Sequence, residues 1–214
     1  MIEVRRLIVL LILLLVLGAG SYSYIQSLSD EAVRLALSED GYFEQLSLVF
    51  WALLSAFIIW RWWPGSWQSW AVAMLPLIAM AREASLHKAI YGISVLKRKF
   101  YLSPDIPLMS KLLLGCIVLI LLSALLYGLY LSVLWLKDGA WKRSSGQFLL
   151  AGLGLLIGTK VLDRMNAVLR KDFGIILPPH FAESVAVFEE SFEMALPLVL
   201  LAAARYVWLE NKKT

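Results

Sequence analysis

Cysteine and histidine are scarce in this chain of 214 residues, which has one cysteine and two histidines. A single cysteine excludes an intramolecular disulfide and any cysteine metal cluster. Cys116 stands in an uninterrupted apolar run, so we interpret it as a small hydrophobic side chain. A Walker sequence, a dinucleotide-binding fingerprint and an internal repeat are also absent, and the corresponding nucleotide-binding and repeat classes therefore have no support in the sequence.

Charge is scarce as well: charged residues make up 17% of the chain and hydrophobic residues 60%, and the mean hydropathy is +0.75. A soluble core of this size cannot bury so much apolar surface, so the composition predicts a polytopic integral membrane protein. The net charge is +4, but the basic residues stand mostly at the ends of apolar segments. We therefore expect membrane lipids as partners and no nucleic acid.

Hydropathy predicts an all-α fold, a single integral membrane domain over residues 1–214 built as a transmembrane helical bundle of about six spans. The predicted spans are residues 7–25, 43–63, 68–90, 110–136, 147–170 and 184–209. The first span is followed by small residues and also resembles a signal peptide, although we favour an uncleaved anchor.

The flanks of these spans predict their orientation, because cytoplasmic loops collect lysine and arginine. Basic residues before the first span and after the last place the N- and C-termini in the cytoplasm, and the tryptophans fall largely at the same predicted ends. The basic run 97–99 contradicts this assignment. The compactness of the chain favours a bacterial inner (plasma) membrane.

Short polar segments separate the spans. Ser29 and Asp30 can cap a short amphipathic helix, with Val33, Ala36 and Leu37 on its apolar side, which we expect on the outer surface between the first two spans. Prolines at 104, 107, 178 and 179 predict that residues 91–110 and the segment around 178–180 are not regular helices.

Charged residues inside the apolar stretches are the best functional clue, because ionisable groups at membrane depth are costly and usually pair with one another or with a ligand. Alternating helix directions place them all in the outer half, where the second, third, fifth and sixth spans would surround a polar cavity. The residues are Glu44; Arg82, Glu83, His87 and Lys88; Lys160, Asp163 and Arg164; and Glu189, Glu190 and Glu193.

Helical spacing groups these side chains, since residues three or four apart share a face. Glu83 would share a face with His87, and Glu193 with Glu189. Gly154 and Gly158 form a small-xxx-small pair that would let the fifth span approach a neighbour closely.

The first functional hypothesis is a site for an anionic lipid headgroup, a small solute or an ion. Bases would hold the anionic group while the glutamates supply counter-charge. The residues expected to bind the ligand are Arg82, Lys88, Lys160, Arg164 and Glu189.

Two alternatives stay open, and with them whether the protein is an enzyme. Oxygen and imidazole ligands could hold a divalent zinc, manganese or iron ion that activates water for hydrolysis of a lipid or lipid-linked substrate. Alternatively, the charges could cancel in a structural network of a scaffold or accessory subunit with a partner membrane subunit. The expected metal ligands are Glu44, Glu83, His87, Asp163, Glu190 and Glu193.

Overall fold

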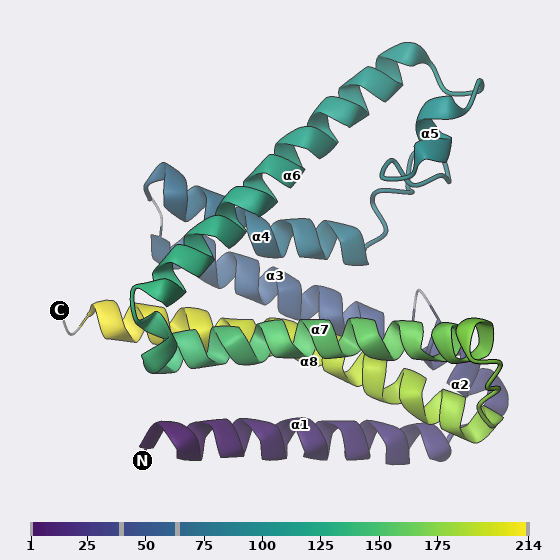
Figure 1. Cartoon of the computed structure of the whole chain (residues 1–214), viewed down its shortest axis with the longest axis horizontal. Helices are drawn as coiled ribbons and strands as arrows, with labels where there is room; N and C mark the ends of the chain where they lie inside the picture. The colour runs from purple at the N-terminus through teal and green to yellow at the C-terminus, as the bar shows by residue number, and fades with distance from the viewer. Residues whose placement is uncertain (1, 39–40, 63–64, 213–214) are drawn as a thin grey trace. The chain divides into compact units, whose positions relative to one another are not determined.

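The computed structural model describes residues 2–38, 41–62 and 65–212, and every regular element in these ranges is a helix. The chain divides into two compact units, one of residues 1–50 with 139–214 and one of residues 51–138. Figure 1 shows the helices in chain order. They are α1 (Ile2–Gln26), α2 (Asp30–Ala36), α3 (Tyr42–Trp62), α4 (Trp67–Glu83), α5 (Arg98–Leu102), α6 (Leu108–Lys137), the 3₁₀ turn η1 (Ala140–Lys142), α7 (Ser144–Asp172) and α8 (Pro179–Asn211).

In the first unit, α7 and α8 form an antiparallel hairpin (Figure 1). Its register is fixed at three levels: Ser145 bonds to Glu210, Gly152 faces Leu200, and further along Lys160 pairs with Glu193. The two helices therefore run side by side over most of the length of α7. If α7 crosses a membrane, α8 lies in the membrane beside it.

Gly152 is the point where the two helices approach most closely, because a Cβ built there would lie 2.7 Å from Cδ2 of Leu200. The predicted pair of Gly154 and Gly158 does not make this approach: a Cβ at either position would meet nothing within 4 Å. Helical rotation explains the difference, since two residues along a helix turn the side-chain direction by about 200°. The small-xxx-small prediction was therefore wrong for the α7–α8 contact.

Helix α1 packs against α8 in the opposite direction and so runs parallel to α7. Near its C-terminal end, a Cβ on Gly18 would lie 2.7 Å from the ring of Phe188. Towards its N-terminus, Leu10 and Leu14 pack on the buried cluster of Phe148, Val199 and Ala203. The N-terminus of α1, the start of α7 and the end of α8 consequently lie at one end of this unit (Figure 1).

A short helix follows α1 where one was expected. The Ser29 hydroxyl accepts a hydrogen bond from the Ala32 amide and caps α2. Ala36 is buried, and Val33 and Leu37 pack against a cluster that includes Ile25. A short capped helix was expected here, while its amphipathic character and its place on the outer membrane surface stay predictions.

The second unit pairs α4 with α6, where a Cβ on Gly128 would contact Leu75 at 2.9 Å. The predicted third span is too long, because α4 ends at Glu83 and residues 84–90 form turns. Ser85 has a φ of 48°, in the left-handed region that a right-handed helix cannot include. The 17 residues of α4 extend about 25 Å at 1.5 Å per residue.

The irregular segment before α6 contains only the short α5, as its prolines predicted. Phe100 is fully buried and packs edge-on against Tyr101. The Tyr91 hydroxyl donates to Ser110 at 2.8 Å, and the Lys111 ammonium donates to the Ser103 carbonyl at 2.6 Å. These bonds tie the segment to the start of α6.

Candidate functional site

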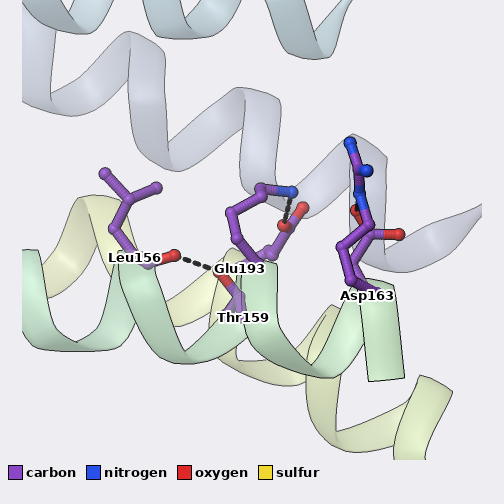
Figure 2. A network of polar contacts seen from close by, with 6 residues as sticks. Leu156, Thr159, Asp163 and Glu193 are labelled. Atoms are coloured by element: carbon purple, nitrogen blue, oxygen red, sulfur yellow. Dashed lines mark hydrogen bonds and ion pairs between the residues drawn. The ribbon is translucent and has the colours of Figure 1, made fainter. Parts of the chain in front are cut away.

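An ion pair between α7 and α8 is the centre of the candidate site. The Lys160 ammonium lies 2.5 Å from Oε1 of Glu193, and the two side chains are 37% and 20% exposed. Figure 2 labels Glu193 and marks this contact with a dashed line. The helices place them opposite each other because the pair lies in the same antiparallel register as the glycine contact of Gly152. This charge-assisted bond joins two residues that stand in separate predicted spans.

Three further ionisable groups surround the pair. Glu189, one turn before Glu193, lies close enough to Lys160 and Asp163 to interact with both electrostatically. Asp163 also faces Arg164 at 3.8 Å, a long contact between side chains that are 46% and 80% exposed (Figure 2). We call Lys160, Asp163, Arg164, Glu189 and Glu193 the α7–α8 charge group.

Thr159 packs beneath this group and is fully buried. Its hydroxyl donates to the Leu156 carbonyl at 3.0 Å (Figure 2), so the hydroxyl is satisfied within α7 and is not directed at a ligand.

The charge group contains three carboxylates and two bases. Lys160 is engaged by Glu193, and the nearest carboxylate to Arg164 is Asp163. Both bases thus have carboxylate partners, which leaves Glu189 as the carboxylate in excess. Such an arrangement suits a small cation or a proton better than an anionic headgroup.

The remaining predicted site residues lie elsewhere. Glu190 is half-buried on α8, and Glu44 is half-buried in the first turn of α3. Arg82 and Glu83 end α4 in the other unit, followed in the turns by His87 and Lys88. Glu83 and His87 therefore do not share a helical face, because the helix ends before His87.

The predicted convergence of all four clusters on one cavity, including the four residues of the second unit, stays a prediction. In the part of the chain that the structure describes, no three histidine, cysteine, aspartate or glutamate side chains are grouped so that they could hold a metal ion. The metal assignment thus gains no support from the geometry.

A second polar contact between α7 and α8 escaped the sequence analysis. Ser145 is fully buried, and both its amide and its hydroxyl donate to the Glu210 carboxylate, at 3.2 and 2.5 Å. A glutamate at the open amides of a helix start is an ordinary capping arrangement. Since Glu210 is 65 residues away, only a prediction of the helix pairing could have found it.

The length and composition of the helices show the general class of protein to which this chain belongs. By length and composition, four of the described helices can cross a membrane, over Ile8–Gln26, Tyr42–Trp62, Leu108–Lys137 and Ser144–Asp172. The chain is an all-helical protein with the features of an integral membrane protein. No known protein family matches the sequence, and no match was found among curated proteins or solved structures.

Proposed function

We propose that the α7–α8 charge group is a binding site for the cationic part of a small solute, such as an ammonium group, inside an integral membrane protein. The observation that carries the proposal is the Lys160–Glu193 pair with Glu189 beside it. Ionisable groups within a spanning segment are costly and usually serve a ligand or an ion pathway. Of the ligands that the sequence suggests, an anionic headgroup is less favoured at the charge group, because its two bases, Lys160 and Arg164, already face carboxylates.

The proposal includes six membrane spans, with α4 and α8 crossing in addition to the four apolar helices. Contacts at three levels keep α8 beside α7, so α8 crosses wherever α7 does. Glu189 and Glu193 of the charge group face α7. Their interactions there lower the free-energy cost of inserting α8 into the membrane.

The direction of α1 supports a crossing by α4. Because α1 and α7 are parallel, the chain must return across the membrane an odd number of times between them. Crossings by α3 and α6 alone make two, and α4 supplies the third. The helix is shorter than the roughly 30 Å hydrocarbon core, a mismatch that local thinning of the bilayer can accommodate.

This threading places both termini on one side of the membrane. The basic residues at that side favour the cytoplasm, in a bacterial inner membrane. Membrane lipids are then the immediate partners. A partner membrane subunit would complete the polar cavity that the sequence predicts.

Cation binding can be tested with the full chain in lipid nanodiscs. Isothermal titration with methylammonium, putrescine and spermidine chlorides, against sodium chloride as a blank, identifies any organic cation that binds. We expect Glu189→Gln to weaken that binding at least tenfold, because it removes the excess carboxylate. The matched control is Glu183→Gln, the same change at a glutamate of α8 outside the charge group.

Binding by none of these cations, or equal affinity in Glu189→Gln and the native chain, would contradict the proposal. The second candidate, a structural ion-pair network in a scaffold, is favoured by the Lys160–Glu193 contact itself. It predicts that Glu189→Gln changes neither cation binding nor stability, whereas the loss of Glu193 lowers stability.

A further inference from the structure

One end of the first unit carries basic and tryptophan side chains from three segments that are distant in the sequence. We define the basic end as Arg5, Lys142, Arg143, Arg205 and Lys212, all of them exposed. Contacts within the unit bring these segments together: Ser145 bonds to Glu210, and the first half of α1 packs on the cluster that contains Phe148 and Val199.

Two of these cations lie over tryptophan rings. Lys142 Nζ stands 5.2 Å from the ring centroid of Trp141, and Lys212 Nζ stands 4.3 Å from that of Trp208. Trp141 is 53% exposed. Tryptophan collects at the headgroup level of membranes, and a cation held on its face is positioned at that same level.

Glu210, an acidic side chain at the same end of the unit, is turned away from these cations. Both oxygens of the Glu210 carboxylate accept hydrogen bonds from Ser145, which directs this carboxylate towards the start of α7. Glu210 therefore does not neutralise the cations at the surface.

We infer that the basic end binds anionic phospholipid headgroups and selects them over zwitterionic ones. Phosphate oxygens would contact the ammonium and guanidinium groups, while the tryptophans pack against the glycerol region. This inference requires membrane insertion but is independent of cation binding by the charge group. The surface belongs to the proposed cytoplasmic side, where anionic lipids and basic residues meet.

The experiment is native mass spectrometry of the detergent-solubilised full chain with equal amounts of phosphatidylglycerol and phosphatidylcholine. Each basic residue near an anionic surface contributes roughly fivefold to binding, so the triple variant Lys142→Gln, Arg143→Gln, Lys212→Gln should lose at least tenfold of the preference for phosphatidylglycerol. Raising the salt concentration should weaken binding to the native chain.

Two further variants separate position from charge and from misfolding. Lys97→Gln, Arg98→Gln, Lys99→Gln removes the same charge from the second unit and should keep the preference. Lys142→Arg, Arg143→Lys, Lys212→Arg retains the charge and should also keep it. An equal loss in the 97–99 variant, or a native chain without preference, would overturn the inference; neither result would bear on Glu189.

Discussion

The pair of Lys160 and Glu193 offers a residue-scale prediction about coupling. Removing either charge leaves the other, partly buried, without its hydrogen-bonded partner, so Lys160→Gln and Glu193→Gln should each lower the free energy of unfolding by about 1.5–3 kcal/mol. The double variant should lose less than the sum of the single losses, since neither charge is then isolated. Thermal unfolding of all four proteins in one detergent gives the coupling, and strictly additive losses would contradict the contact.

Glu210 allows a second prediction at the same scale. Its carboxylate receives two hydrogen bonds at the start of α7, so Glu210→Ala should destabilise the hairpin by about 0.5–2 kcal/mol, the usual cost of a lost helix cap. Hydrogen exchange of the amides in the first turn of α7 should accelerate. The control is Glu31→Ala, at an exposed position of α2, and faster exchange in both variants would count against a local capping role.

At the scale of elements, two neighbouring glycines of α7 should behave differently. A leucine at position 152 would collide with Leu200 and force the helices apart, at a cost of roughly 1–3 kcal/mol as for other overpacked sites. A leucine at position 154 would enter open space. We expect Gly152→Leu to lower the melting temperature in detergent well below that of Gly154→Leu, and the reverse order would mean that the register of the hairpin is wrong.

The ends of the helices were harder to predict from the sequence than their existence. The third span was expected to reach residue 90, but α4 ends at Glu83. The end depends on one left-handed residue, Ser85, and serine carries no strong signal for that conformation. In contrast, the prolines at 104 and 107 predicted an irregular segment correctly. The break expected around 178–180 is only partly as predicted, because α8 already begins at Pro179, a position in the first turn of a helix that proline tolerates. Pro76 and Pro197 lie inside α4 and α8.

At the scale of the whole molecule, the number of spans is directly testable. Six spans place the loops before α6 and after α7 outside the cell and the loop before α7 inside. Single cysteines at Leu96, Asp138 and Ile176, in a Cys116→Ser background, can be labelled on intact cells with an impermeant maleimide. We expect labelling at positions 96 and 176 and protection at 138 until the cells are permeabilised.

Four spans would reverse the pattern at all three positions, 96, 138 and 176. Labelling at 138 with protection at 96 would therefore remove α4 from the membrane and contradict the parallel arrangement of α1 and α7. A cysteine at Thr214 should be protected in either case and checks that the cells are intact.

The sequence alone determined the helical class, the apolar segments and the positions of the charges within them, because each follows from local composition and periodicity. It also placed Lys160, Asp163, Arg164, Glu189 and Glu193 among the candidate site residues. Each of these residues can be recognised from its own segment of the sequence, without knowledge of the segment that packs against it.

Tertiary structure alone decided which of these residues meet. Lys160 pairs with Glu193, and Ser145 with Glu210, because one antiparallel register aligns α7 with α8; Gly152 rather than Gly154 faces the partner helix for the same reason. Register depends on side-chain fit between helices that are distant in sequence, and hydropathy contains no information about that fit.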